Sequence, residues 1–302
     1  MLYGFDVGGT KIELAVFDKE LKEVWRKRVP TPHQSYEAFL DIFVTLVNEA
    51  DERFQCQGTI GIGVPGIVDI QNKTVFTTNI DIAKNKPFIW DLETRLKRNI
   101  EVNNDANCFA LSEAFTPELQ QYQQVLGVIL GTGLGGGIVT QHKIVSGLNG
   151  CAGEIGHFKL PLDCLQILGY DIPVIACGCG QKGCCERYLS GTGFTWLYEH
   201  FYQVSEAAPD IIKLYYQGQP EAVEHVERYL ELLAAYLANV LMIIDADLVV
   251  IGGGLSNFDE IYHQLPNRLT KYLLKVMKPP RIEKARYGDS GGARGAALLC
   301  LK

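Results

Sequence analysis

No stretch of this 302-residue sequence has the roughly 20 consecutive apolar residues that a membrane-spanning helix needs. The longest candidate, Leu232 to Ile244, is shorter than that and contains Asn239. The opening residues MLYGFDVGG also lack the basic region and the long apolar stretch of a secretory signal. We therefore expect a cytoplasmic protein that does not bind membranes.

The sequence also lacks an excess of basic residues. It has 28 Lys and Arg against 35 Asp and Glu, a net charge of −7, and its pI is near 5.5. Because domains that bind nucleic acid usually have a pI above about 9, we expect no nucleic-acid partner. No G-x-x-x-x-G-K-[ST] pattern is present, which excludes a P-loop.

What is present is an ordinary globular composition, with 47% apolar and 21% charged residues. A chain of 302 residues exceeds what one hydrophobic core usually fills, so we expect two domains. Glycine is frequent, at 31 residues, which indicates several places where the backbone closely approaches another group.

Hydrophobic periodicity predicts two successive α/β units. In the first we expect strands at 2–7, 12–18, 23–29, 59–64 and 100–103, a hairpin at 67–76, and helices at 35–54, 90–98 and 105–115. In the second we expect strands at 124–131, 135–140, 142–147 and 247–254, helices at 221–244, 257–274 and 292–301, and an irregular stretch at 147–185. We place the domain boundary near Pro117, which gives domains 1–117 and 118–290, with the C-terminal helix (291–302) completing the first.

Two glycine-rich turns each open one half of the chain, FDVGGTK at 5–11 and GTGLGGG at 131–137. The second contains the letters G-x-G-x-x-G, but the β-branched residues that follow predict a hairpin and not the helix of a dinucleotide fold. Glycine backbone amides can approach phosphate oxygens, so two such turns could hold one polyphosphate. Asp6 could hold the water shell of a magnesium ion and Lys11 could lie near phosphates; the alternative is that each turn is only a tight hairpin.

Four cysteines within nine residues, in CGCGQKGCCE at 177–186, predict a metal site more than a disulfide framework. Cys177, Cys179 and Cys184 have the spacing C-x-C-x₄-C, and zinc prefers a fourth ligand. Because Cys185 is adjacent to Cys184, spacing alone leaves open which of the two binds.

The motifs in their order resemble the ROK family of sugar kinases and sugar-responsive repressors. They are DVGGTK at 6–11, GVPGIVD at 63–69, NNDAN at 103–107, GTGLGGG at 131–137, EIGH at 154–157 and CGCGQKGCCE at 177–186. The resemblance covers nearly the whole chain and implies a two-lobed α/β fold of the actin-like ATPase (ribonuclease H-like) class, with a nucleotide and sugar cleft between the lobes. It further implies ATP-dependent phosphorylation of N-acetyl-D-glucosamine to its 6-phosphate, with ATP, Mg²⁺ and a structural Zn²⁺ as cofactors, by a homodimeric enzyme.

The resemblance also assigns nucleotide-binding residues around both turns and at a third glycine pair. They are Gly4, Phe5, Asp6, Val7, Gly8, Gly9, Thr10, Lys11, Gly131, Thr132, Gly133, Leu134, Gly135, Gly136, Gly137, Ile138, Val139, Thr140, Gly253 and Gly254.

Asp105 is the candidate catalytic base, because it lies where a predicted strand ends and a helix begins. The residues alone equally favour a capping role for Asp105 or Asn104, and the resemblance favours the base. Polar groups with planar geometry suit sugar hydroxyls, and Asn79, Asn104, Glu154, His157 and Glu186 fit this description. The resemblance places Glu154, His157 and Glu186 at sugar-contacting positions. Gly66 would let the backbone approach the sugar, and Asp105 completes the set of candidate substrate-binding residues. For Asn79 a simple turn role is the alternative.

The resemblance completes the metal site, with His157, Cys177, Cys179 and Cys184 as ligands and Cys185 as a bystander. Four protein ligands leave no position for water, so the zinc would be structural.

Three alternatives to a kinase that acts on N-acetyl-D-glucosamine are a repressor, a filament-forming protein and a kinase for another sugar. A repressor of the same family would carry a helix-turn-helix ahead of the first turn, where only five residues precede Asp6. A filament-forming relative of actin would have no use for Asp105 or for the metal site. Phosphorylation of glucose, fructose or N-acetylmannosamine is compatible with every motif above.

Overall fold

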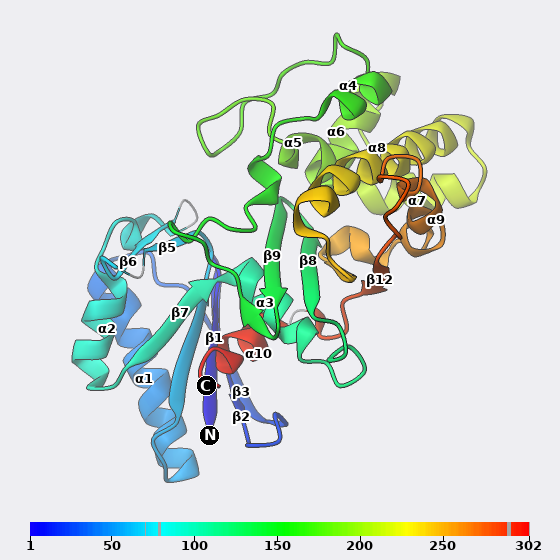
Figure 1. Cartoon of the computed structure of the whole chain (residues 1–302). Helices are drawn as coiled ribbons and strands as arrows, with labels where there is room; N and C mark the ends of the chain where they lie inside the picture. The colour runs from blue at the N-terminus through cyan, green and yellow to red at the C-terminus, as the bar shows by residue number, and fades with distance from the viewer. Residues whose placement is uncertain (70, 78–79, 289–290, 302) are drawn as a thin grey trace. The chain divides into compact units, whose positions relative to one another are not determined.

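The computed structural model describes residues 1–69, 71–77, 80–288 and 291–301, and Figure 1 labels its helices and strands. The chain divides into two compact units. Unit 1 consists of Met1–Gln120, Gly137–Ala152 and Arg286–Lys302, and unit 2 consists of Gln121–Gly136 and Gly153–Ala285. This division differs from the predicted domains 1–117 and 118–290, because it assigns residues 137–152 to the first unit. The reason is close packing within unit 1: a Cβ on Gly137 would lie 2.5 Å from the carbonyl oxygen of Ala106.

Unit 1 is built on a five-stranded sheet of order β3-β2-β1-β4-β7. Its strands are β1 (Leu2–Val7), β2 (Lys11–Phe17), β3 (Glu23–Pro30), β4 (Thr59–Val64) and β7 (Ile100–Asn104). β1, β2 and β3 pair antiparallel, and β4 and β7 add in parallel. A two-stranded hairpin, β5 (Ile67–Asp69) with β6 (Thr74–Phe76), and the short helix η1 (Asp81–Ala83) connect β4 to the next helix.

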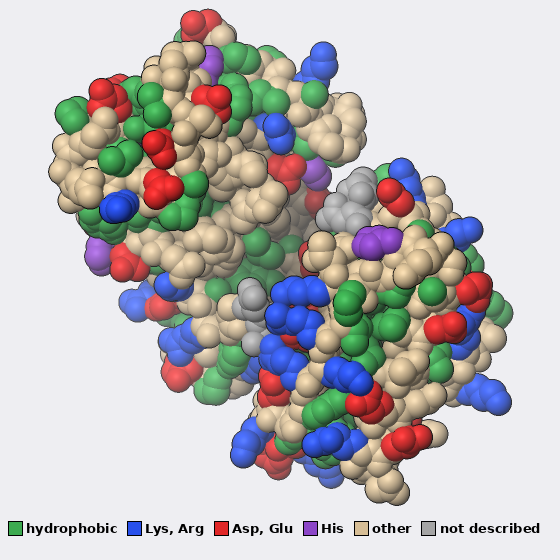
Figure 2. Space-filling view, turned by 180° about the vertical axis from the view of Figure 1, so that it is seen from behind, with side chains coloured by type: hydrophobic (Ala, Val, Ile, Leu, Met, Phe, Trp, Pro, Cys, Tyr) green, Lys and Arg blue, Asp and Glu red, His purple; other side chains and the backbone are tan. Residues whose placement is uncertain are grey.

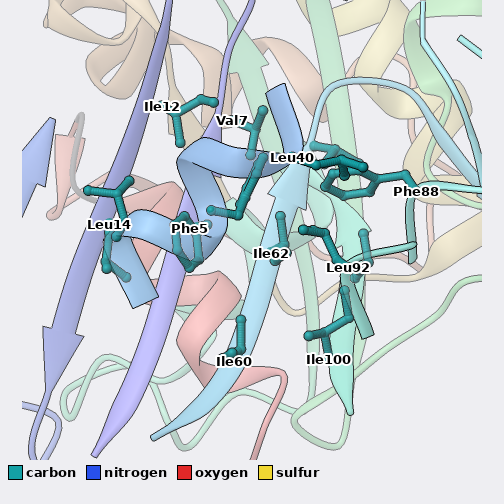
Figure 3. Close-up of a cluster of buried hydrophobic side chains, with 14 of the residues drawn as sticks. Phe5, Val7, Ile12, Leu14, Leu40, Ile60, Ile62, Phe88, Leu92 and Ile100 are labelled. Carbon is teal, nitrogen blue, oxygen red and sulfur yellow. The ribbon is translucent and has the colours of Figure 1, made fainter. Parts of the chain in front are cut away.

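One face of this sheet carries the main hydrophobic core of unit 1, under α1 (Tyr36–Phe54) and α2 (Phe88–Leu96). Figure 3 shows Phe5 and Ile62 from the sheet among side chains that include Leu40 of α1 and Phe88 of α2. Ser35 is the N-cap of α1, since its hydroxyl oxygen accepts a hydrogen bond from the backbone N–H of Ala38 at 3.1 Å.

The opposite face carries α3 (Asp105–Ala114) and α10 (Gly291–Leu298). α10 lies directly on the sheet, because a Cβ on Gly4 or Gly61 would come within 1.9 or 1.8 Å of carbonyl oxygens of that helix. A Cβ on Gly295 would similarly lie 1.7 Å from the carbonyl oxygen of Cys108 in α3. Glycine at these contacts lets two helices and a sheet pack backbone to backbone.

Unit 2 contains β8 (Gln124–Leu130), β11 (Leu248–Gly252) and β12 (Arg281–Lys284), which pair in parallel. The complete sheet has the order β10-β9-β8-β11-β12, with β9 at Leu134–Thr140 and β10 at Lys143–Ile144. The helices of unit 2 are η2 (Ile155–His157), α4 (Leu162–Leu168), α5 (Glu186–Leu189), α6 (Gly191–Tyr202), α7 (Ala208–Tyr216), α8 (Pro220–Ile244), η3 (Gly254–Asn257) and α9 (Glu260–Leu269). The 25-residue α8 has the buried stripe that its sequence predicts.

Several sequence predictions about unit 2 are wrong in detail. The stretch 147–185 was expected to be irregular, but it contains α4, which follows Pro161 and ends at Gly169, where φ is +94°. The helix expected at 257–274 is α9, which is shorter and contains Pro266. Strand β12 was not predicted, because four residues are too short for a clear alternating pattern.

None of the helices in the described ranges combines the length and apolar character needed to cross a membrane. No two cysteines in the described part of the chain form a disulfide.

Candidate active site

The first glycine turn of unit 1 joins β1 to β2 and is held by the backbone around it. The Gly8 N–H donates to the Lys11 carbonyl at 2.8 Å, and the Thr31 hydroxyl donates to the Gly8 carbonyl at 2.7 Å. Asp6, on β1 just before the turn, lies against the first turn of α10, where a Cβ on Gly292 would be 2.7 Å from its Cγ. The turn therefore presents a half-buried carboxylate beside glycine backbone.

Asp105 is the first residue of α3, and Asn104 is its N-cap. The Asn104 Oδ1 accepts hydrogen bonds from the backbone N–H groups of Ala106 and Asn107, at 2.8 and 3.3 Å. The Asp105 Oδ1 also accepts from Ala106, at 2.9 Å. Asn104 thus satisfies two backbone donors of the helix end, which removes capping as the main reason for a carboxylate at position 105.

Asn104 also ties α3 to the loop before β5. Its Nδ2 donates to the Gly66 carbonyl at 2.9 Å. Gly66 has φ +120°, and a Cβ there would lie 2.2 Å from the Phe76 carbonyl oxygen. The close approach that glycine permits at this position is therefore one between two backbone segments of unit 1.

The carboxylates of Asp6 and Asp105 both influence the pKa of one buried thiol, that of Cys108. The pKa of Cys108 is raised well above its usual value, first by burial and then by the negative charges of Asp105 and Asp6. Cys108 lies under β4, where a Cβ on Gly63 would be 3.2 Å from its sulfur. Unit 1 therefore holds two carboxylates within electrostatic range of the same point on its sheet.

The second glycine turn joins β8 to β9 in unit 2, as a hairpin. The Gly131 N–H donates to the Gly133 carbonyl at 3.0 Å. The segment continues as strand β9 and not as a helix, which confirms that the G-x-G-x-x-G letters do not form a dinucleotide motif.

Two other segments of unit 2 lie against this turn. At the start of α6, the Gly191 N–H donates to the Gly131 carbonyl at 2.7 Å and the Thr192 hydroxyl donates to the Thr132 carbonyl at 2.8 Å. Gly253 has φ +83°, and a Cβ there would lie 2.5 Å from the Leu130 backbone. The turn is thus fixed from both sides within the unit.

Glu154 and His157 lie at the two ends of the short helix η2, which packs against β9. A Cβ on Gly156 would lie 2.0 Å from the Leu134 carbonyl oxygen, and the Tyr236 hydroxyl donates to the Ile155 carbonyl at 2.9 Å. The Glu154 Oε2 is 3.8 Å from the His157 Nε2. Burial raises the pKa of Glu154; the nearby His157 opposes that rise and the charge of Glu186 adds to it.

The four predicted metal ligands come together in unit 2. The ligand atoms of His157, Cys177, Cys179 and Cys184 all lie within 4.8 Å of one another. The Cys177 Sγ is 3.7 Å from the His157 Nδ1, and the Cys179 Sγ is 3.7 Å from the Cys184 Sγ. Three sulfurs and one imidazole nitrogen are the donor set that tetrahedral zinc prefers.

Cys185 is buried outside this group. Its backbone N–H donates to the Phe158 carbonyl at 2.8 Å, and burial raises the pKa of its thiol. The structure therefore gathers Cys184, and not its neighbour, with the other three residues.

Glu186 connects the cysteine cluster to the second glycine turn. Its Oε1 is 3.5 Å from the Cys177 Sγ, and its Oε2 accepts the Leu134 N–H at 3.2 Å. A Cβ on Gly133 would lie 2.6 Å from the same Oε2. One carboxylate thus contacts both features of unit 2.

The candidate residues therefore fall into two groups, each gathered within its own unit. Unit 1 holds Asp6, Lys11, Gly66, Asn104 and Asp105, and unit 2 holds Glu154, His157, Glu186 and the three cysteines. Asn79 lies outside the described residues. For Gly4 and Gly137 the structure gives a packing reason, against α10 and α3 respectively.

A model of the ROK family matches residues 2–302. The chain belongs to the ROK family. It is 56% identical to the N-acetyl-D-glucosamine kinase of Yersinia pseudotuberculosis over 301 residues, which cover 100% of this chain and 99% of that protein. The family and the fold class predicted from the motifs are confirmed.

Solved structures of ROK proteins share the fold. The ROK hexokinase from Thermus thermophilus is 28% identical with a TM-score of 0.86, covering 99% of this chain and 97% of that one. A ROK family glucokinase from Streptomyces griseus, in complex with glucose and AMPPNP, is also 28% identical, with a TM-score of 0.76 and coverage of 99% and 98%.

Residues 190–193 are part of a segment that resembles the family, but none of them was predicted to be a site residue. The Ser190 hydroxyl caps α6 by accepting the Gly193 N–H at 3.1 Å, and the next two residues contact the glycine turn. The signal was available, because Ser followed by Gly-Thr-Gly and an aromatic run is typical of a helix start. Tyr236 had no comparable signal, because the helical pattern of α8 does not reveal that its hydroxyl donates a hydrogen bond to the Ile155 carbonyl.

Proposed function

We propose that this ROK family member transfers the γ-phosphoryl group of ATP to the 6-hydroxyl of N-acetyl-D-glucosamine. The observation that carries the proposal is the 56% identity over full length to a protein named for this activity. In the reaction the sugar O6 forms a bond to the γ-phosphorus, the bond from that phosphorus to the β–γ bridging oxygen breaks, and ADP leaves.

We assign the nucleotide to the two glycine turns, with the pair Gly253–Gly254 beside the second. Fixed backbone N–H groups without a Cβ in the way suit phosphate oxygens. Carboxylate oxygens are ligands that Mg²⁺ accepts, directly or through water, so Asp6 would hold the metal bound to the phosphates. Lys11, on the strand that leaves the first turn, would neutralise phosphate charge.

We assign Asp105 as the base that accepts the proton of the attacking hydroxyl. The argument rests on its neighbour: because Asn104 caps α3, the carboxylate of Asp105 is not required for the helix. The start of a helix also stabilises the ionised form of a carboxylate, which is the form that can accept a proton.

We assign sugar binding to Asn104, Asp105, Glu154, His157 and Glu186, with the backbone at Gly66 and the side chain of Asn79. The proximity of Glu154 and Glu186 supports this assignment, because burial and then the charge of Glu186 raise the pKa of Glu154, and sugar hydroxyls could donate to both carboxylates. Neutral hydroxyl donors would relieve that repulsion without adding charge.

We propose that His157, Cys177, Cys179 and Cys184 hold a structural zinc ion. The donor set fits, and Glu154 near the Nε2 of His157 fits the pattern in which a carboxylate orients a zinc-binding histidine. Thiolate ligands persist in a reducing compartment, which supports a cytoplasmic location. Bound zinc would fix the loop of Glu154 and His157 to the segment that carries Glu186.

The main competing substrate is another hexose. Solved ROK structures include a hexokinase and a glucokinase with this fold, so the fold does not select the sugar. The test is ADP release with MgATP and a panel of glucose, fructose, N-acetylmannosamine and N-acetylglucosamine. We expect the highest kcat/KM for N-acetylglucosamine; a tenfold higher value for glucose, equivalent to about 1.4 kcal/mol, would make the chain a glucokinase.

A further inference from the structure

A line of polar residues crosses the sheet of unit 1 at the level of Asp6. In the register of β1, β2 and β3, Asp6 pairs with Glu13 and Glu13 pairs with Arg28. On the other side Asp6 pairs with Gly63, and Gly63 pairs with Asn103, next to the cap of α3. The line therefore runs from the exposed edge strand to the candidate catalytic residues.

Glu13 is the unusual member of this line, because its carboxylate is only 2% exposed. Its Oε1 accepts from the Arg26 Nη1 at 2.8 Å, and its Oε2 accepts from the Arg28 Nε at 2.7 Å. The arginine side chains reach towards solvent, at 25% and 44% exposure. Figure 2 shows several Lys and Arg side chains close together in the lower half of the view, near its middle, with acidic side chains among them.

Glu13 lies on the same face of the sheet as Asp6. Ala15 and Phe17 are two and four residues after Glu13 along β2, so they lie on the same face of the strand, and both pack against α10. Asp6 also lies against the start of α10, at Gly292. Residues paired directly across an antiparallel pair have Cβ atoms about 5 Å apart, and two like charges there repel each other.

A hydrophobic residue would fill this position without that repulsion, and two arginines would then be unnecessary. Their presence indicates that the charge at position 13 has a use, and Asp6 is the charged group across the strand pair. We propose that Glu13, held by Arg26 and Arg28, is a positioning residue that sets the electrostatic environment of Asp6 and thereby the affinity for magnesium with nucleotide. This inference rests on the proposed role of Asp6 in holding Mg²⁺.

Removing the negative charge of Glu13 and removing a positive charge of Arg28 should change the affinity for a divalent cation in opposite directions. Glu13→Gln keeps the size of the side chain but removes the negative charge that neutralises part of the charge of Arg26 and Arg28, beside Asp6. A divalent cation should therefore bind more weakly. Arg28→Gln removes one positive charge while Arg26 still pairs with Glu13, so the cation should bind more tightly. The double variant E13Q/R28Q restores the wild-type net charge of the group.

The experiment measures the Mg²⁺ concentration that gives half-maximal binding of AMPPNP, by calorimetry without turnover. For E13Q we expect that concentration to rise roughly three- to tenfold, as one charge at this distance and effective dielectric would produce. The KM for the sugar should stay within about twofold of wild type, and E13Q/R28Q should return the Mg²⁺ dependence to near the wild-type value. Glu49→Gln is the matched control, because Glu49 pairs with Lys27 of the same strand β3 but both side chains are about 40% exposed.

An unchanged half-saturating Mg²⁺ concentration in E13Q would overturn the proposal. So would a half-saturating concentration in E13Q/R28Q that is higher than in E13Q, because a purely structural role predicts that each further substitution weakens binding more. If E13Q does not fold, R28Q carries the test: a fall in the half-saturating Mg²⁺ supports the proposal and no fall refutes it. Failure of the wild-type protein to phosphorylate any sugar would instead refute the proposed function.

Discussion

The two units hold their candidate polar residues in different ways. In unit 1, Asp6 lies near the end of β1, Asn104 ends β7 and Asp105 begins α3. In unit 2, Glu154 precedes the short helix η2, and Cys177 and Cys179 lie on a loop. Strand register and helix capping fix the first group, whereas the second group is held by turn hydrogen bonds, such as the Cys177 N–H to the Gln181 carbonyl at 2.8 Å, and by contacts between side chains.

This difference indicates where the proposed metal would add to the structure. Backbone hydrogen bonds and glycine packing leave the unit 1 carboxylates little freedom, because α10 and α3 lie directly on the sheet. Residues 169–185 of unit 2 form no helix or sheet strand and are held by isolated bridges, such as Ala176 with Lys182 and Lys159 with Cys184. A metal bound by four ligand atoms that lie within 4.8 Å of one another would add a cross-link to this segment. Changes in unit 1 should therefore act on chemistry or on packing, and changes at the cysteines should act through the metal.

The largest effect is expected for Asp105→Asn. The variant keeps the shape of the side chain and the Asn104 cap but removes the proton acceptor, so kcat should fall about 10²-fold or more with little change in melting temperature. Asn104→Ala is the control for capping and should lower stability by about 1 kcal/mol. Full activity in D105N would leave no catalytic role for this carboxylate.

Next in size is the loss of the metal from unit 2. Cys184→Ser should abolish stoichiometric zinc and lower kcat/KM for the sugar roughly 10- to 100-fold, with a smaller effect on nucleotide affinity. Cys185→Ser is the matched control and should retain zinc, because Cys185 lies outside the ligand group. Elemental analysis separates the two, and zinc retained by C184S but lost from C185S would reverse the assignment.

The close packing of unit 1 can be tested by adding one methyl group. Gly4→Ala places a Cβ 1.9 Å from the Ala293 carbonyl oxygen, so the sheet and α10 must separate. We expect a loss of about 1 to 3 kcal/mol in the free energy of unfolding. Gly254→Ala in unit 2, where nothing lies within 4 Å of the added Cβ, should cost little. Equal stability of the two variants in denaturant titrations would show that α10 does not constrain the sheet.

An effect of pH on stability is also expected, through a histidine of α8. His225 is fully buried among aromatic rings that include Phe194 and Tyr198, and burial, reinforced by Arg228, lowers its pKa from 6.5 to about 3. The unfolded chain therefore binds more protons between these values, so stability is complete above about pH 6.5 and is lost as pH falls towards 3. Between pH 7 and pH 5 the loss should be about 2 kcal/mol.

His225→Leu should reduce that pH dependence whatever its effect at pH 7. His263→Leu is the control, since the side chain of His263 is 70% exposed. Unfolding titrations at the two pH values make the comparison, and an unchanged slope in H225L would assign the acid sensitivity to other groups.

The regular parts of the fold could be predicted from the sequence. The Ser35 cap, the buried stripe of α8 and the hairpin at GTGLGGG follow from local patterns, and the structure has all three. α4 could not be predicted, because its seven residues begin after a proline within a glycine- and cysteine-rich stretch that hides helical periodicity. Strand β12 was missed because a short parallel strand is specified by its neighbour β11 more than by its own residues.

The part of the candidate site that could be predicted is the part whose residues lie close together in the sequence or match a family motif. The metal ligands were found from spacing and family resemblance, and the structure gathers those four residues. The residues alone did not decide between Asn104 and Asp105 as the cap, since that depends on backbone geometry at the end of β7. Glu13 gave no signal at all, because only strand register places it beside Asp6.

The most direct test of the central claim is a competition between two sugars for limiting ATP. N-acetylglucosamine and glucose at equal concentration are incubated with the wild-type protein and Mg²⁺, and the phosphorylated products are quantified by mass spectrometry and positioned by NMR. The product ratio equals the ratio of kcat/KM values. We predict N-acetylglucosamine 6-phosphate as the main product, and a predominance of glucose 6-phosphate, or phosphate on another hydroxyl, would contradict the assignment.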